Sequence, residues 1–421
     1  MAVNQTLLAC ILNFCGGGYI GYNLAIISGL AIPFITCTVF DKSDDINVSL
    51  YQGLFNGIIY IIAGFSSYLI AYLAKKLGNK KTVMIIGIVG FICPLLAIIS
   101  NNFWLAFIGR SLSGFAVTGA STLLPPYSST LVPEHLKSRI ATVLNMSICA
   151  FIFCATLFNL WLIPHFEIDN CQPLTPFSWK FQLGFPMVFG LIIFICSLFT
   201  KEDSVIDTIV EKVDVETTKL LDVKKESLWT KSNVKYIVLA LMSAIMTQIT
   251  GISCITFYAP QLLQMAGIDN VLLPQMLISG VWNVMCSIIC MFVVNKISLK
   301  TLMLSSLIIM FVGSAGIIIP FFIPSIAFVV IIGMVVFILG FQVGVSPLFY
   351  VICAVSYPSS ISSQACSLAN LSMWLFSAVT SIIIPPLFNA IGVPYTELIF
   401  ALCQVIYFVY VYFAFDKDNL K

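Results

Sequence analysis

Twelve apolar segments, each long enough to cross a bilayer, dominate this amino-acid sequence. A transmembrane helix needs about 20 predominantly apolar residues. Inside the hydrocarbon core, only helices and closed barrels satisfy their own backbone hydrogen bonds. The segments cover approximately residues 7–35, 50–74, 82–100, 103–129, 140–163, 181–199, 236–264, 271–294, 301–320, 325–353, 363–389 and 394–415. We therefore predict an all-α membrane protein with 12 transmembrane helices.

A charged stretch divides these segments into two groups of six. Residues 201–235 alternate acidic and basic side chains, and the spacing of Val205, Ile209 and Val213 is typical of an amphipathic helix. The sequence thus predicts three parts: an N-terminal six-helix bundle over 1–200, a cytosolic linker with amphipathic helical segments over 201–235, and a C-terminal six-helix bundle over 236–421.

The composition agrees with a protein embedded in lipid. Of the 421 residues, 60% are hydrophobic and 9% are charged, whereas a soluble domain is about 25% charged. The net charge of +2 argues against a nucleic-acid partner, and no obligate protein partner is evident. The sequence contains no CxxC motif or Cys/His cluster, so we expect neither a metal nor a cofactor. Cys37 and Cys171 could pair in an oxidising exterior, but we expect that they do not.

Basic residues predict the orientation of the chain in the membrane. If the crossings alternate, all 20 basic residues except Lys42, Arg110 and Lys180 lie in loops or tails on one side. The positive-inside rule places that side, with both termini and the linker, in the cytosol. Asn47 then begins an exterior N-glycosylation sequon, Asn47-Val48-Ser49, although such a sequon also arises by chance. An exterior sequon favours the plasma membrane and a glycoprotein.

Short loops recur at matching positions in the two halves. The turn KKLGNKK (75–81) follows the second segment, and NKISLK (295–300) follows the eighth. The stretch PPYSSTLVPEHLKSR (125–139) follows the fourth segment, and PLFYVICAVSYPSSIS (347–362) follows the tenth. A duplicated six-helix unit of this kind places the substrate near the middle of the membrane, where the halves meet.

The seventh segment carries an unusual number of polar and helix-loosening residues. The stretch TQITGISCITFYAP (247–260) contains an amide, a glycine, a serine, an aromatic pair and a proline. Such residues cost free energy in a membrane unless they face protein or a water-filled cavity. We predict that this helix faces a cavity, although helix packing through small residues would by itself explain Gly251 and Ser253.

A series of motifs, in order along nearly the whole chain, resembles the sugar-porter (GLUT-like) family of the major facilitator superfamily (MFS). The motifs are GYIGYNLAIISG (18–29), KKLGNKK (75–81), GRSLSG (109–114), the run 127–146, TQITGISCITFY (247–258) and SGVWN (279–283). The chain is identified as a divergent member of that family. The resemblance implies the MFS fold, in which two pseudo-symmetric six-helix bundles enclose a central site.

The resemblance also implies which side chains contact a sugar. Amides offer a donor and an acceptor to hydroxyl groups, and aromatic faces pack on the C–H surface of a sugar ring. The implied substrate-binding residues are Asn145, Gln248, Ser253, Tyr258, Asn283, Tyr350 and Trp374. The alternative for each is a satisfied interhelical hydrogen bond or a packed core aromatic. No catalytic residue is expected, because a membrane enzyme would need intramembrane acids, metal ligands or a nucleophile beside a base.

The cytosolic gate of the family is only partly present. The implied gating residues are Lys76, Gly78, Lys80, Arg110, Lys137 and Arg139. Thr130 and Val355, however, stand where the family usually has glutamates that pair with arginines of the cytosolic turns. We expect Arg110 to pair with carbonyls at helix ends. The salt bridges that hold the inner gate shut in relatives are thus largely missing.

The acidic residues favour transport without proton coupling. Asn23 stands where proton-coupled relatives carry aspartate, and the other acids, Glu397 among them, are expected at helix ends or in loops. We therefore predict facilitative uniport of a small neutral sugar, a hexose and foremost glucose, by alternating access. The alternatives are a carrier of another polyol or neutral solute, a proton-coupled sugar symporter, and a non-transporting sugar sensor.

Restoring the missing charges tests the interpretation of the gate. Val355→Glu combined with Ser362→Arg is expected to slow inward opening about twofold to fivefold, because a partly exposed ion pair of ~0.5–1 kcal/mol must then break. Sugar exchange in proteoliposomes measures this rate, with each single substitution as a control. Unchanged transport kinetics in the double variant would contradict the interpretation.

Overall fold

The computed structural model describes residues 4–39, 48–99, 101–163, 173–201, 229–293, 297–349 and 362–414. Every regular element in these ranges is a helix. Eleven helices in the described ranges are long and apolar enough to cross a membrane. Helix α5 (Phe103–Thr122) adds a further helix of 20 residues, which carries Arg110. The predicted all-α membrane fold is therefore confirmed.

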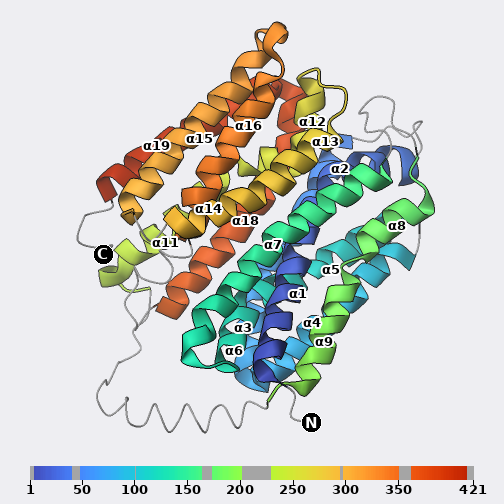
Figure 1. The fold of residues 1–421 in the computed structure, drawn as a ribbon, viewed down its shortest axis with the longest axis vertical. Coiled ribbons are helices and arrows are strands. Elements are labelled where there is room, and N and C mark those ends of the chain that lie inside the picture. The colour runs from blue at the N-terminus through green and yellow to red at the C-terminus, as the bar shows by residue number, and fades with distance from the viewer. Residues whose placement is uncertain are drawn as a thin grey trace.

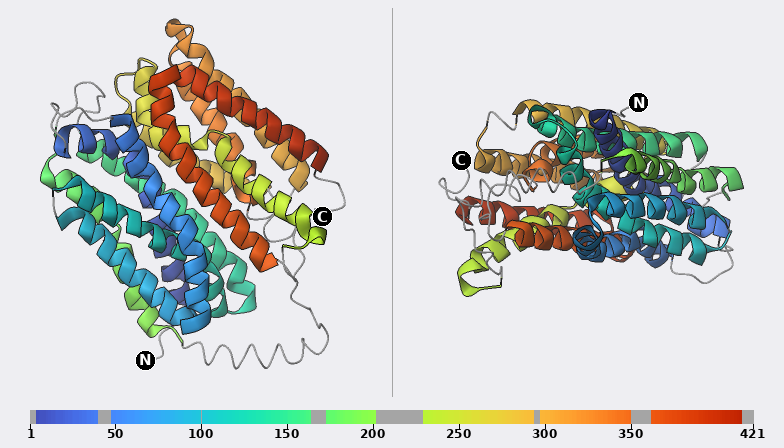
Figure 2. Two further views of the ribbon diagram at one scale, coloured as in Figure 1. Left: turned by 180° about the vertical axis from the view of Figure 1, so that it is seen from behind. Right: turned by 90° about the horizontal axis from the view of Figure 1, so that it is seen from below.

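The helices of the first half of the chain form one group (Figures 1 and 2). Its elements are α1 (Gln5–Ala25), α2 (Ile27–Ile32), the π-helix η1 (Pro33–Val39), α3 (Val48–Leu77), α4 (Asn79–Ile99), α5, α6 (Leu124–Thr130), α7 (Glu134–Leu162), α8 (Pro176–Gly184) and α9 (Met187–Phe199).

The helices of the second half form the other group. They are η2 (Lys231–Asn233), α11 (Val234–Ile249), α12 (Ile252–Met265), α13 (Leu272–Gln275), η3 (Met276–Trp282), α14 (Asn283–Val293), α15 (Leu299–Ile318), η4 (Ile319–Phe321), η5 (Pro324–Ile326), α16 (Val329–Gly340), η6 (Phe341–Val345), α18 (Ser362–Ile391) and α19 (Val393–Ala414). We call the end of the molecule where α9 ends and α11 begins the linker face, and the other end the opposite face.

Helix ends follow from local sequence signals. The side chains of Asn4, Asn102 and Ser298 accept hydrogen bonds from backbone N–H groups at the starts of α1, α5 and α15. Gly78 separates α3 from α4 with φ of 86°, a left-handed conformation that favours glycine. The tight basic turn predicted over 75–81 therefore rests on this one residue.

Within the first group, α1 approaches α7 backbone to backbone. A Cβ atom on Gly21 would lie 2.1 Å from the carbonyl oxygen of Ile148. Small residues permit this close packing, which drives helix association where lipid removes the hydrophobic contribution. The glycine-rich first motif is thus part of the scaffold of the bundle.

Cys37, in η1, is disulfide-bonded, and the expectation that it does not pair was wrong. The sequence offers no local signal for this bond, because pairing depends on the distance between two distant segments. Most of the predicted linker, together with Asn47, Cys171, Tyr350 and Val355, lies outside the described residues.

Replacing glycine by alanine at two helical positions tests the packing. Gly21→Ala is expected to lower the free energy of unfolding by about 1–3 kcal/mol, because the methyl group overlaps the α7 backbone. Gly64→Ala is the matched control: its Cβ would meet side-chain atoms no nearer than 3.4 Å, and alanine favours helix by up to about 1 kcal/mol. Thermal unfolding in detergent measures both, and equal effects would contradict the packing argument.

Candidate functional site

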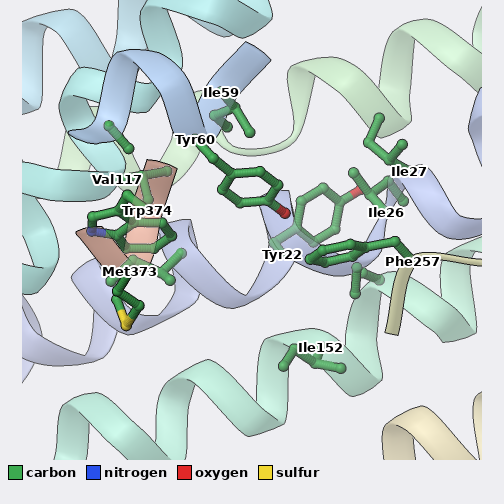
Figure 3. Close-up of a cluster of buried hydrophobic side chains, with 14 of the residues drawn as sticks. Tyr22, Ile26, Ile27, Ile59, Tyr60, Val117, Ile152, Phe257, Met373 and Trp374 are labelled. Carbon is green, nitrogen blue, oxygen red and sulfur yellow. The ribbon is translucent and has the colours of Figure 1, made fainter. Parts of the chain in front are cut away.

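Four aromatic side chains from both groups of helices meet in the middle of the molecule. Tyr22 comes from α1, Tyr60 from α3, Phe257 from α12 and Trp374 from α18 (Figure 3). The Tyr60 ring stacks on Trp374 with centroids 5.9 Å apart and planes at 9°, and on Phe257 at 5.5 Å and 26°. We call these four residues the central aromatic cluster. It joins the two halves of the chain where the duplication predicts the substrate site.

Trp374 brings an unused hydrogen-bond donor to this cluster. Its side chain is 6% exposed, and its indole Nε1 has no hydrogen-bond partner in the described part of the chain. A buried indole N–H normally finds an acceptor. A ring with one stacked face and a free N–H is suited to a ligand that carries both C–H surface and hydroxyl groups.

The helix-loosening stretch of the seventh segment contains a break in the helix at Gly251. Helix α11 ends at Ile249 and α12 begins at Ile252, and Gly251 between them has φ of 94°. Tyr258, within α12, also departs from helical geometry, with φ of −125° and ψ of 17°, two residues before Pro260. A left-handed residue interrupts the helical hydrogen bonds, so α11 and α12 can change their mutual angle.

The predicted residues of this stretch differ in their surroundings. Gln248 is half-buried in the last turn of α11 and makes no hydrogen bond to a described residue. Ser253 and Tyr258 are buried and bonded to α18: the Ser253 hydroxyl lies 3.0 Å from the Thr380 hydroxyl, and Tyr258 donates to the Ser381 carbonyl at 2.5 Å. Gln248 therefore keeps a free amide, whereas Ser253 and Tyr258 attach α12 to α18.

Asn283 and Asn145 are also placed differently from each other. Asn283, 7% exposed, accepts a hydrogen bond from the Gln342 amide of η6. Asn145 is exposed on α7, one turn before Cys149, whose thiol lies 3.0 Å from the Ser287 hydroxyl of α14. Asn145 is thus next to a contact between the two groups of helices. Tyr350 lies outside the described residues.

Several central residues were missed by the sequence analysis. Tyr22 and Phe257 lie inside motifs quoted for the resemblance, so their aromatic character could have indicated a role. Tyr60 and Gln342 lie in long apolar segments without a distinguishing pattern. Only the packing of α3 against α18 and of η6 against α14 brings them to the site.

Arg110 donates to backbone carbonyls, of which that of Asn23 is near the end of α1, as expected, whereas that of Phe55 lies inside α3. Its side chain is 3% exposed, its Nε donates to the Phe55 carbonyl at 2.8 Å, and an Nη donates to the Asn23 carbonyl at 3.3 Å. The guanidinium also lies 5.5 Å from the centre of the Phe55 ring. The Asn23 amide donates to the Tyr19 carbonyl at 2.8 Å. No acid of the described chain accepts a hydrogen bond from this cation.

The gating residues of the linker face have structural contacts. Lys80 donates to the carbonyls of Leu198 and Thr200 at 3.3 and 2.7 Å, where a cation stabilises the end of α9. Lys76 lies over the Tyr72 ring at 5.7 Å. Thr130 donates to the Tyr127 carbonyl within α6. Lys137 and Arg139 belong to α7, and their side chains are outside the description.

Neutral polar side chains join the two groups of helices at the opposite face. Gln52 of α3 donates to Gln261 of α12 at 3.2 Å, Gln275 of α13 donates to Ser28 of α2, and Asn389 of α18 donates to Ser49 of α3. We call these three pairs the amide latch. The side chains of Cys149 and Ser287 also join the two groups, at mid-depth.

One acid departs from the expected environment. Glu397 lies near the start of α19, as predicted, but it is completely buried. Position along a helix is readable from the sequence, whereas burial depends on which helices cover that face.

Two groups of membrane-spanning helices around a central site define this protein as a membrane transporter, and not an enzyme. The chain matches the family model "Sugar (and other) transporter" over residues 9–416, and it belongs to that family. The resemblance to MFS sugar porters read from the sequence is thereby confirmed.

Relatives extend over nearly the whole chain. The glucose transporter GlcP of Staphylococcus epidermidis is 27% identical over 447 residues, covering 98% of this chain and 94% of that protein. The galactose-proton symporter of Escherichia coli is 24% identical over 437 residues, covering 96% and 89%. The inward open conformation of the E. coli xylose transporter XylE matches with a TM-score of 0.79 at 19% identity, covering 100% and 98%.

Two substitutions in the broken helix distinguish a free amide from a bonded hydroxyl. Gln248→Ala is expected to raise the KM for the transported sugar about threefold to tenfold, the equivalent of one hydrogen bond of ~1 kcal/mol. Ser253→Ala, whose hydroxyl is already bonded to Thr380, is the control and is expected to lower stability with little change in KM. Initial uptake rates measure both, and an unchanged KM in Gln248→Ala would assign that residue to structure.

Proposed function

We propose that this protein carries a hexose, foremost glucose, by facilitated diffusion. The observation that carries the proposal is a central site built from neutral groups. The stacked rings of Tyr60 and Trp374, the free indole N–H and the free Gln248 amide match a neutral polyhydroxyl ring. The one charged side chain that the described residues bring to the centre, Arg110, is already engaged by backbone carbonyls. The name of the Staphylococcus relative supports glucose.

The arrangement of the helices supports alternating access. The amide latch closes the opposite face, which supports a state whose central site opens toward the linker face. Opening the opposite face requires these three pairs to separate. Because α12 carries Gln261 and is separated from α11 at Gly251, movement of α12 is the smallest change that breaks one of them.

We also propose that the linker face is cytosolic and that the membrane is the plasma membrane. The distribution of basic residues supports the first point. The disulfide-bonded Cys37 lies in η1, near the opposite face, and disulfides persist where the environment is oxidising. Glycosylation at Asn47 is part of the same proposal.

Proton-coupled sugar symport is the second candidate. Relatives named galactose-proton and arabinose-proton symporters belong to the same set of matches, and the buried Glu397 is a titratable group inside α19. Uniport is better supported because residue 23, beside Arg110, is a neutral asparagine. Its amide donates to the Tyr19 carbonyl of its own helix. A group that takes up and releases protons is therefore lacking at that position.

Uptake of radiolabelled glucose in a transporter-deficient host tests uniport. We expect saturable uptake that other hexoses inhibit, that stops when the internal and external concentrations are equal, and that a protonophore leaves unchanged. The same host without the protein is the control. Accumulation that collapses with the protonophore would establish symport instead. Uptake of a polyol without any hexose would overturn the substrate.

A further inference from the structure

Glu397 is a buried acid with no partner that could neutralise it. The residue is 0% exposed, and neither carboxyl oxygen makes a hydrogen bond of normal geometry in the described chain. The thiol of Cys254 in α12 lies beside it. An ionised carboxylate in such surroundings costs so much free energy that the group neutralises instead. Burial in this conformation therefore favours the neutral form of Glu397 over the ionised form.

The helices packed around α19 bring no cation near this acid. Helix α12 contributes Cys254 and, one turn on, Tyr258. Helix α15 contributes Lys300, which donates to the carbonyl of Tyr412, about 22 Å further along α19 by helical rise. Helix α11 contains the titratable residues Lys235 and Tyr236, and α18 contains Cys366. All three lie at the linker-face ends of these helices. Cys403 belongs to α19 itself.

The same face of α19 supports the break between α11 and α12. Gln404 follows Glu397 by two helical turns and donates to the Thr250 carbonyl at 2.8 Å and to the Ser314 hydroxyl at 2.9 Å. Between them, Phe400 lies where a Cβ on Gly251 would be 3.0 Å away. One face of α19 thus follows the broken helix along its length. Glu397 contacts α12, Phe400 contacts the break at Gly251, and Gln404 contacts the end of α11.

We propose that Glu397 is a proton-binding site that controls movement of α12 about the break at Gly251. The neutral acid packs beside Cys254 and permits the present, latched position of α12. The ionised acid requires water, which reaches it only when α12 is displaced. In this proposal the proton is not carried with the sugar, because α19 contributes no residue to the central aromatic cluster and packs on α15, α18, α11 and α12 of the second group of helices. This inference rests on the proposed function for its transport readout.

The sign of the pH effect follows from linkage. The state with Glu397 buried binds the proton more tightly than the displaced state. Lowering the pH therefore favours the latched position of α12, and raising the pH favours the displaced position. Transport that needs both positions in turn then depends on pH, and neutral glutamine at residue 397 removes that dependence.

The first test measures hexose exchange in proteoliposomes between pH 6 and pH 8.5. We expect the wild-type rate to change about fivefold, at the lower end of typical coupling, and Glu397→Gln to show a flat profile. Glu397→Asp, which still titrates, is expected to keep a pH dependence. Tyr395→Phe, at an exposed position of the same helix, is the control. A Glu397→Gln profile as steep as that of wild type would overturn the proposal.

A second test needs no substrate and so separates this inference from the proposed function. Peptide mass spectrometry follows N-ethylmaleimide labelling of Cys254, which is 0% exposed in the latched position. Thiol ionisation raises labelling with pH in both wild type and Glu397→Gln. Ionisation of Glu397 displaces α12 only in wild type, so the wild-type labelling is expected to rise more steeply with pH. Parallel curves would overturn the proposal even if no hexose is transported. Sugar-driven external alkalinisation that disappears in Glu397→Gln would also overturn it, because the proton would then be cargo.

Discussion

The hydrogen bond from Gln404 to the Thr250 carbonyl is the interaction on which the arrangement of the second half depends. A break in a membrane helix leaves backbone carbonyls unpaired, and the hydrocarbon core offers no water to satisfy them. Gln404 supplies the donor from α19 and is itself placed by a second bond, to Ser314. With the break satisfied in this way, α12 can be held separately from α11, by Ser253 and Tyr258 against α18. The broken helix is therefore stable without being rigid.

Among the described residues, neutral polar pairs, and not ion pairs, join the two groups of helices at the opposite face. The cytosolic salt bridges of the family cannot form at residues 130 and 355, because this chain has Thr130 and Val355 where the family usually has glutamates. The amide latch instead joins the two groups of helices at the opposite face through amides and hydroxyls. Such pairs are weaker than ion pairs in a low-dielectric interior, but breaking them exposes no unpaired charge. An opposite face joined by neutral pairs and a centre whose one described cation, Arg110, is held by backbone carbonyls are compatible with a carrier whose substrate is a neutral sugar.

The sequence analysis identified the residue types of the site better than their roles. Asn283 and Trp374 lie on helices that contact the first group, but Asn283 is bonded to Gln342 while Trp374 keeps an N–H with no described partner. Nothing in the local sequence distinguishes a satisfied amide from a free one, since the partner lies on another helix. The same reason explains the missed disulfide at Cys37 and the unexpected burial of Glu397.

Hydrophobic length, helix order, the basic turns and the glycine break are properties of single segments. A bilayer imposes them on any chain with this pattern, and the sequence alone was sufficient for the all-helical fold and the family. The stacking of Tyr60 between Phe257 and Trp374, the amide latch and the support of Gly251 by α19 each join segments that are far apart in the chain. Only the tertiary structure decides them, because every apolar helix presents several faces and packing selects which one meets a partner.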